Sequence, residues 1–336
     1  MSEEQKSRTS VFYRSVDSWA CGWYRCYVPG VELQKLGYRV AMAQDLHERD
    51  VIDHDVLVIQ APCVPEHLAG IRLAKQSGKL TVVDLDDDLW NLMPTNPVYS
   101  FWSRPDVQYL LTACAQEADL LTTTTHYLAD RLAPRNSNVR VLGNMLPADA
   151  WDYPAPKEQH AGKVVIGWAG SPSHVGDLTL IDEAVRQTLD RYPHVEFVFV
   201  GGPKQPEIAA HPRVRTLPAS DIAGYVRMLG GFDIGLIPLS DTVFNRCKSD
   251  LKFVEYSMVG IPSIVSKVEP YLRSVKQGEN GFFAASPKDW IKTLARLIDD
   301  PELRLAVGTR AQEYARTRTI DQAVGRWEKA YGLTRP

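Results

Sequence analysis

The 336-residue sequence lacks the features that mark several large classes of protein. Its longest apolar run, around residues 56–64, is far shorter than the roughly 20 residues that a membrane-spanning helix needs. The first ten residues are polar and charged, without the apolar core of a signal peptide, so we expect a cytoplasmic protein. The five cysteines form no Cys-x-x-Cys pair, which argues against a structural zinc site or a disulfide framework.

Familiar catalytic signatures are also missing. The chain has no Gly-x-Ser-x-Gly turn, no His-Glu-x-x-His motif and no Walker A loop. The formal net charge of −3 provides no overall attraction to nucleic acid. Residues 1–152 hold 14 Lys and Arg against 20 Asp and Glu, whereas residues 153–336 hold 24 against 21. An anionic ligand is therefore expected in the second half.

Strand and helix patterns alternate along most of the chain. Apolar runs predict strands at residues 11–14, 38–43, 56–60, 80–84, 120–124, 139–142, 164–168, 195–200, 214–217, 233–238 and 262–266. Helical patterns lie between and after them, among others at residues 177–191, 250–258, 287–298, 301–316 and 320–331. Such alternation predicts an α/β protein with doubly wound parallel sheets.

The composition changes near the middle of the chain, where Pro147, Pro154 and Pro156 follow one another closely. We therefore expect two Rossmann-like domains facing a cleft, joined by a linker. The predicted boundaries are residues 1–150 for the first domain, 151–162 for the linker, 163–318 for the second domain and 319–336 for a C-terminal helix. Ligands of such sheets bind beyond the carboxyl ends of the strands.

A turn rich in small residues follows the strand predicted at residues 164–168. Gly170, Ser171 and Ser173 allow backbone N–H groups to approach a ligand, and a helix N-terminus attracts negative charge. This combination suits a diphosphate. It is not the Gly-x-Gly-x-x-Gly pattern, so a nicotinamide or flavin dinucleotide is not indicated. A tight turn without any ligand is the alternative.

The most informative polar residues lie just before and within the helix predicted at residues 250–258. Lys248, Lys252 and Glu255 lie four and three residues apart, so they are predicted to share one helical face. Lys248, with the free amides of Ser249 and Asp250, is suited to bind phosphate, and Glu255 to accept hydrogen bonds from a ribose. A plain surface ion pair between Lys252 and Glu255 is the alternative.

From residue 164 onward the chain resembles the nucleotide-binding domain of glycosyltransferase family 4, whose members are retaining enzymes of the GT-B fold. The matching segments are residues 166–170, 197–202, 232–239, 248–265, 278–283 and 300–304. The first half resembles that fold only at residues 23–25, Pro29 and residues 33–40. The resemblance implies a GT-B architecture with the nucleotide on the second domain and a C-terminal helix that returns to the first.

The resemblance also implies roles for single residues. Glu255 matches the second glutamate of the family's pair, which binds the ribose, but the first glutamate is replaced by Cys247. The turn from Gly170 to His174 matches the phosphate loop of the family. A basic residue is often found just beyond that loop, and His174 is the nearest candidate for it here. No metal ion is implied, and no cofactor besides the nucleotide-sugar donor.

Candidate acceptor-side residues follow the strands of the first half. Trp19, Gly22 and Trp23 come after the first strand, followed by Arg25, which is expected to reach a phosphate. A packed aromatic cap is the alternative at this place. His126 follows the strand at residues 120–124, where it is either an acid or base or a hydrogen-bonded helix-start residue.

An acidic run, Asp-Leu-Asp-Asp-Asp, occupies residues 84–88 at the end of a predicted strand. Clustered carboxylates can hold Mg²⁺ or Mn²⁺. Because the resemblance implies no metal, we favour acceptor binding or loop structure for Asp86, Asp87 and Asp88. Asp86 is then a catalytic candidate together with Lys248 and Arg25.

These observations favour a glycosyltransferase that moves a sugar from a nucleotide-sugar to an acceptor hydroxyl with retention, the cations and amides stabilising the leaving diphosphate. Three alternatives stay open: a phage-type transferase acting on modified bases in DNA, a sugar-nucleotide epimerase, and a non-catalytic nucleotide-sugar-binding protein. The acceptor is open among a glycan, a lipid-linked sugar, a protein and a modified nucleic acid, and so is the oligomeric state.

Overall fold

The chain folds into two compact units. The computed structural model describes residues 9–152, 162–201 and 207–333. The first unit comprises the residues up to Pro147, the short segment Cys247–Ser249 and the residues from Thr319 onward. The second comprises Ala148–Arg246 and Asp250–Arg318. The residues that follow the last long helix therefore pack with the N-terminal half of the sequence.

The expected linker, residues 151–162, lies mostly outside the described residues. Its first residue is described and is not linker-like, because Trp151 is 1% exposed. Trp151 makes an edge-to-face contact with Tyr225 of the second unit, with 6.1 Å between the ring centroids. The second unit thus begins a few residues earlier than the proline pattern predicts.

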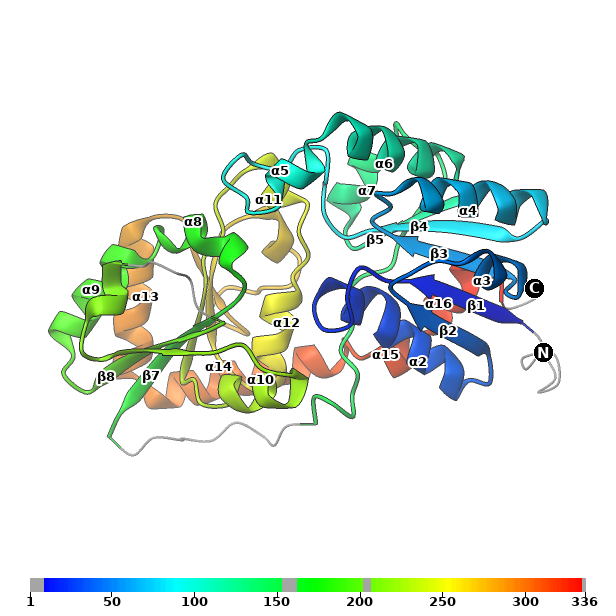
Figure 1. Ribbon diagram of the computed structural model, residues 1–336. Coiled ribbons are helices and arrows are strands. Elements are labelled where there is room, and N and C mark those ends of the chain that lie inside the picture. Colours follow the sequence, from blue (N-terminus) through cyan, green and yellow to red (C-terminus); the bar gives the residue numbers. More distant parts are fainter. Residues whose placement is uncertain (1–8, 153–161, 202–206, 334–336) are drawn as a thin grey trace. The chain divides into compact units, whose positions relative to one another are not determined.

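In the described part of the first unit, six parallel strands form a sheet of order β2-β1-β3-β4-β5-β6 (Figure 1). The strands are β1 (Ser10–Arg14), β2 (Arg39–Ala43), β3 (Val56–Gln60), β4 (Leu80–Leu85), β5 (Leu120–Thr123) and β6 (Val139–Val141). The helical segments are a π-helical turn, η1 (Trp23–Tyr27), then α2 (Val28–Lys35), α3 (Glu48–Ile52), α4 (Pro65–Gln76), α5 (Tyr99–Trp102), α6 (Pro105–Glu117), α7 (His126–Leu132), α15 (Ile320–Ala323) and α16 (Gly325–Ala330).

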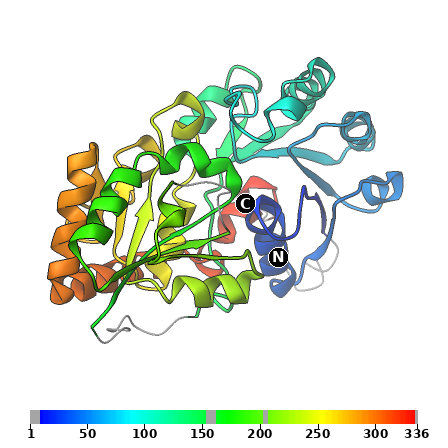
Figure 2. The ribbon, with the colours of Figure 1, turned by 60° about the vertical axis from the view of Figure 1, so that its left-hand side comes forward.

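The two faces of this sheet are covered by different helices. Figures 1 and 2 show α4 and α6 on one face and α2 on the other, beside α15. The first face has a core that includes Leu57, Ile71 and Leu111. On the other face Tyr13 of β1 meets Tyr331, which directly follows α16, with 6.2 Å between the ring centroids. Both faces are buried, which explains why the central strands read as continuous apolar runs.

In the described part of the second unit, another six parallel strands form a sheet of order β12-β11-β10-β7-β8-β9. The strands are β7 (Val164–Ala169), β8 (Val195–Val200), β9 (Val214–Leu217), β10 (Ile234–Ile237), β11 (Ser263–Ser266) and β12 (Phe282–Ala284). The helical segments are η2 (Pro172–His174), α8 (Val175–Leu178), α9 (Asp182–Arg191), η3 (Glu207–Ala210), α10 (Ile222–Leu229), α11 (Val243–Arg246), α12 (Leu251–Met258), η4 (Glu269–Tyr271), α13 (Pro287–Asp299) and α14 (Pro301–Arg316).

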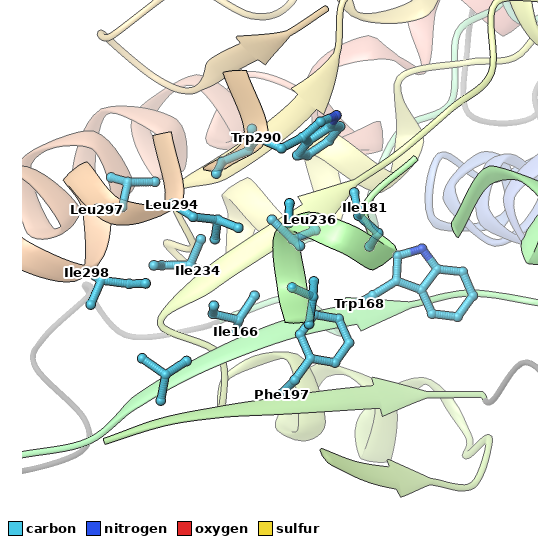
Figure 3. Close-up of a cluster of buried hydrophobic side chains, with 14 of the residues drawn as sticks. Ile166, Trp168, Ile181, Phe197, Ile234, Leu236, Trp290, Leu294, Leu297 and Ile298 are labelled. Atoms are coloured by element: carbon cyan, nitrogen blue, oxygen red, sulfur yellow. The ribbon is translucent and has the colours of Figure 1, made fainter. Parts of the chain in front are cut away.

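The core of the second unit lies between its sheet and the helices α9 and α13. Figure 3 shows Ile166 and Trp168 of β7 and Phe197 of β8 in this cluster, together with Trp290 and Leu294 of α13. Alternate residues of the strands face the opposite side, where α12 packs. There a Cβ at Gly235 of β10 would lie 2.4 Å from the ring of Tyr256, so glycine is required for α12 to approach the sheet.

The helices of both units begin with clear local signals and are short. The helices α4, α6, α13 and α14 each have proline in their first turn, where its missing N–H leaves no hydrogen bond unmade. The longest described helix is α14, with 16 residues. None of the described helices has the length and apolar character required to cross a membrane.

Two helices that the sequence predicts as continuous are interrupted. The segment predicted at residues 177–191 divides into α8 and α9, and Leu178 and Ile181, which flank the break, both belong to the core. The segment predicted at residues 320–331 divides into α15 and α16 before Gly325, a weak helix former. The short elements α3, α5, α11 and β12 were not predicted.

Candidate functional site

The loop after β1 is held in shape by Asp17, which the sequence analysis did not single out. Its Oδ1 accepts hydrogen bonds from the backbone N–H groups of Trp19 (3.0 Å) and Gly22 (3.2 Å). A Cβ at Gly22 would lie 2.0 Å from the Asp17 carbonyl oxygen, so only glycine fits. The Trp19 side chain is 74% exposed, whereas Trp23 stacks on Tyr27. The loop thus presents one aromatic ring to solvent and packs the other.

Arg25 is buried and fully engaged by the protein. Its Nε and Nη2 donate to the two carboxylate oxygens of Asp84, at 2.9 and 2.6 Å, and its Nη1 donates to the Leu142 carbonyl. The Thr122 hydroxyl donates to the same carboxylate at 2.6 Å. Burial lowers the pKa of Arg25, but Asp84 outweighs it, and the net pKa is raised. The structure therefore gives Arg25 an internal ion pair instead of the expected phosphate contact.

Asp86 follows β4 and lies beside the thiol of Cys21. Burial, with a smaller contribution from the charge of Asp87, raises the pKa of Asp86 to about 6. In turn, the charge of Asp86 raises the pKa of the Cys21 thiol well above its ordinary range. A carboxyl group with a pKa of about 6 is suited to exchange protons near neutral pH.

Replacing Asp86 by Asn is expected to change how stability depends on pH. Because the folded-state pKa of about 6 lies above the ordinary 3.8, the folded protein holds a proton that the unfolded chain releases. Wild-type stability should therefore fall as the pH rises from about 4 to about 6, and the Asn variant should lack this fall. Urea unfolding at several pH values measures it, and parallel curves for the two proteins would contradict the raised pKa.

The segment Cys247–Ser249 belongs to the first unit, and Lys248 forms an ion pair there. Its Nζ lies 3.2 Å from Oδ2 of Asp87. Burial lowers the pKa of Lys248, but the charge of Asp87 outweighs it, so the pKa is raised and the amine stays protonated. The Cys247 thiol is buried, 3.9 Å from a carboxylate oxygen of Asp88. Burial, and next the charge of Asp88, raise the pKa of Cys247 to about 12, so the thiol is neutral.

Ser249 and Arg25 share one partner. The Asn144 Nδ2 donates to Oγ of Ser249 at 2.9 Å, and the Asn144 Oδ1 accepts from Nη1 of Arg25 at 3.1 Å. Lys248 was expected to share one helical face with Lys252 and Glu255. In the structure Lys248 and Ser249 precede α12 and contact residues of the first unit, so only Lys252 and Glu255 share a helical face.

The remaining acidic residue of the run, Asp88, also has a cationic partner. Its Oδ2 accepts from Nε of Arg131 at 2.7 Å. His126 is the exposed first residue of α7, whose N-cap Thr125 accepts from the N–H of Leu128 at 3.2 Å. Across the part of the chain that the structure describes, no three His, Cys, Asp or Glu side chains are grouped to hold a metal ion.

In the second unit, the turn after β7 is fixed by its own backbone. The Gly170 N–H donates to the Val200 carbonyl at 3.0 Å. Gly201 has a φ of 82°, and a Cβ there would lie 2.5 Å from the Gly170 carbonyl oxygen, so glycine is required on both counts. The hydroxyls of Ser171 and Ser173 lie 2.6 Å apart on the exposed side of the turn. This turn therefore presents two hydroxyls at the carboxyl end of the sheet.

His174 is connected to a buried carboxylate that the sequence analysis missed. Its Nδ1 lies 2.9 Å from Oδ2 of Asp177, and Oδ1 of Asp177 accepts from the Ser240 N–H at 2.8 Å. Burial raises the pKa of Asp177, but the bonds from His174 and Ser240 outweigh it, so the net pKa is lowered. Asp177 begins a predicted helix, where an acidic residue is ordinary, so no sequence signal distinguished it.

The helix α12 places Lys252 and Glu255 on one face. The Lys252 amine donates to the Ala169 carbonyl at the end of β7 and lies 4.8 Å from the centroid of the Trp168 ring. The Glu255 side chain is buried, and its Oε2 accepts from the Tyr225 hydroxyl at 2.9 Å. Tyr225 was not predicted. A cation at the β7 turn and a carboxylate one helical turn away form the candidate nucleotide site.

Asp250 has a structural partner instead of a ligand. Its carboxylate accepts two hydrogen bonds from Arg318, at 2.7 and 3.0 Å, and one from the Ser274 hydroxyl. Burial lowers the pKa of Arg318, but the charge and hydrogen bonds of Asp250 together outweigh burial, so the net pKa of Arg318 is raised. The Asp250 side chain thus ties the start of α12 to the segment after α14, and only its backbone amide stays a candidate for ligand binding.

Comparison with known proteins gives this geometry a context. Residues 163–300 match the family model described as glycosyl transferases group 1. The D-inositol 3-phosphate glycosyltransferase of Corynebacterium glutamicum (strain R) is 29% identical over 151 residues, which is 40% of this chain and 35% of that protein. The match therefore spans about a third of the length of this curated relative.

Solved structures are similar over nearly the whole chain. A sucrose-phosphate synthase from Thermosynechococcus elongatus has a TM-score of 0.71 at 12% identity, covering 97% of this chain and 98% of that one. Anabaena HepE in complex with UDP-glucose has a TM-score of 0.68 at 13% identity, covering 96% and 99%. At these identities the likeness establishes the fold. The two units are thus the two sheet domains of a GT-B fold, and residues 163–300 are similar to the group 1 glycosyltransferases.

Proposed function

We propose that the protein is a glycosyltransferase that moves a sugar from a nucleotide-sugar donor to an acceptor hydroxyl. The observation that carries the proposal is the pair on α12, Lys252 at the β7 turn and the buried Glu255, within a domain that matches the group 1 family. We propose UDP as the donor nucleotide, because HepE shares the fold and binds UDP-glucose.

The second unit has groups for each part of the donor. Glu255 accepts hydrogen bonds from the ribose hydroxyls, and Ser171 and Ser173 donate to the diphosphate. When the bond to the sugar breaks, the diphosphate gains negative charge, which the Lys252 amine stabilises. On the first unit, Asp86 takes the proton of the acceptor hydroxyl, and Lys248 stays the proposed phosphate ligand. We further propose that the anomeric configuration is retained and that no metal ion takes part, as the family resemblance implies.

A melting-temperature panel with UDP, GDP, ADP, CDP and dTDP tests the donor site. A ligand that binds only the folded state stabilises it by about 2.7 kcal/mol at a concentration 100 times its Kd. We expect a raised melting temperature with UDP. If none of the five nucleotides at millimolar concentration shifts the transition, the donor proposal is wrong.

Turnover tests the chemistry. The protein is incubated with UDP-sugars and an acceptor panel that includes neutral oligosaccharides and inositol 3-phosphate, and UDP release is measured with and without EDTA. The anomeric proton of the product, observed by NMR, reports retention or inversion. Loss of turnover in EDTA would contradict the metal-free reaction, and a new sugar-nucleotide formed without acceptor would indicate an epimerase.

A second candidate is a nucleotide-sugar-binding protein without catalytic activity. The observation that favours it is Cys247, which stands where the family has a glutamate and whose buried thiol is neutral. It cannot supply the negative charge of a carboxylate. Nucleotide binding without turnover of any UDP-sugar in the panel above would support this candidate over the transferase.

A further inference from the structure

The first unit contains a cavity that none of the preceding roles uses. Its volume is about 370 Å³, within the range of roughly 300–1,000 Å³ found for small-molecule sites. It is formed by the segment between β4 and α6, and its lining residues are Leu89, Trp90, Asn91, Leu92, Tyr99, Ser103 and Gln108. None of these described lining residues is charged.

The walls of the cavity are held in place by hydrogen bonds. The Trp90 indole N–H donates to Oγ1 of Thr112 at 2.9 Å, and the Arg135 guanidinium lies 3.8 Å from the centroid of its ring. The Gln108 Nε2 donates to the carbonyls of Leu89 and Trp102, at 3.1 and 2.7 Å. The segment is therefore ordered without a ligand, which lowers the entropy cost of binding one.

The same bonds determine which polar atoms remain for a ligand. Because the amide N–H groups of Gln108 and Asn91 donate within the protein, their carbonyl oxygens remain as acceptors. The Ser103 hydroxyl and the Tyr99 hydroxyl can donate or accept. Together with the rings of Trp90 and Tyr99, these groups match a ligand with hydroxyls at its edges and an apolar face.

We propose that this cavity binds a neutral sugar unit of a carbohydrate acceptor. A sugar ring has C–H groups on its faces for the aromatic rings and hydroxyls at its edge for the amide oxygens. A phosphorylated or carboxylated ligand would require a cation in the lining, and a lipid tail would require a lining without amides and hydroxyls. The role of this sugar as an acceptor rests on the proposed function. Binding of the sugar in the cavity does not depend on that function.

The position of the cavity supports this role. Leu89 follows directly after Asp86, Asp87 and Asp88, and the Asn91 side chain donates to both oxygens of Asp88, at 3.1 and 3.0 Å. The cavity therefore adjoins the carboxylate of Asp88, and its lining begins three residues after Asp86, the proposed proton acceptor.

The test compares Tyr99→Ala with Tyr109→Ala and Tyr99→Phe on the full chain. Tyr109 is a matched control, because it is 65% exposed on the neighbouring α6 and does not line the cavity. Binding is measured on an array of neutral oligosaccharides of glucose, galactose, mannose and N-acetylglucosamine, with sialylated and sulfated glycans beside them. The UDP melting shift is measured for each variant.

We expect the wild type to bind neutral glycans and Tyr99→Ala to weaken this binding at least tenfold. Tyr99→Phe, which keeps the ring and loses the hydroxyl, should weaken it less than Tyr99→Ala, and Tyr109→Ala should stay within twofold. The UDP shift should be the same in all of them, because the proposed donor residues lie in the second unit. The inference is overturned if no neutral glycan binds, if only anionic glycans bind, or if Tyr99→Ala binds as well as the wild type. Glycan binding without any nucleotide shift would leave the cavity assigned and the transferase proposal wrong.

Discussion

Glu255→Gln is expected to weaken UDP binding roughly 10- to 100-fold while the protein stays folded. A hydrogen bond to a charged group contributes about 1.5–3 kcal/mol, and 1.4 kcal/mol corresponds to a factor of ten in affinity. The amide has nearly the shape of the carboxylate and can still accept from the Tyr225 hydroxyl, which the carboxylate binds at 2.9 Å. The Kd for UDP by titration calorimetry measures the effect.

The ribose contact can be isolated with a nucleotide that lacks it. If Glu255 binds the ribose diol, 2′,3′-dideoxy-UDP should bind the wild type more weakly than UDP by a similar factor. Glu255→Gln should discriminate much less between the two nucleotides, because the shared interaction is already lost. Glu279→Gln, at an exposed ion pair with Lys276, is the control and should bind both as the wild type does. Equal discrimination in Glu255→Gln and wild type would show that Glu255 acts elsewhere.

The sheets could be predicted from the sequence because buried parallel strands have a strong local signal. In β3 all five residues are buried, and the run from Val56 to Gln60 was predicted with the same boundaries. The helix breaks were not predictable in this way. Leu178 and Ile181, which flank the break between α8 and α9, both belong to the core, so the apolar period continues across the break without interruption.

The partners of the charged residues could not be predicted, because they are distant in sequence. Lys248 binds Asp87 across 161 residues, and Arg25 binds Asp84 across 59. A cation that follows a strand looks the same in sequence whether it binds a phosphate or a carboxylate of its own chain. The acidic run at residues 84–88 was therefore open to interpretation as a metal site. The structure instead places three of its carboxylates beside Arg25, Lys248 and Arg131.

Arg25→Met is expected to destabilise the first unit by about 3–5 kcal/mol, the range found when one partner of a buried ion pair is removed. Asp84, about 2% exposed, would be left with the Thr122 hydroxyl as its described donor, and the Leu142 carbonyl would lose its bond to the guanidinium. Urea unfolding of the variant measures the loss. Arg72→Met, at the exposed pair with Glu117, is the control and should change stability little.

A double variant shows whether the buried charge is the cause. Without Arg25, the Asp84 carboxylate would lie buried without the guanidinium that binds both of its oxygens. The double variant Arg25→Met, Asp84→Asn removes that charge as well, so it should recover part of the stability that Arg25→Met loses, and urea unfolding of the two variants measures the difference. An equal loss in both would show that the buried charge is not the cause. If Arg25→Met instead folds as stably as the wild type and loses turnover alone, the guanidinium acts on a substrate, as the sequence first indicated.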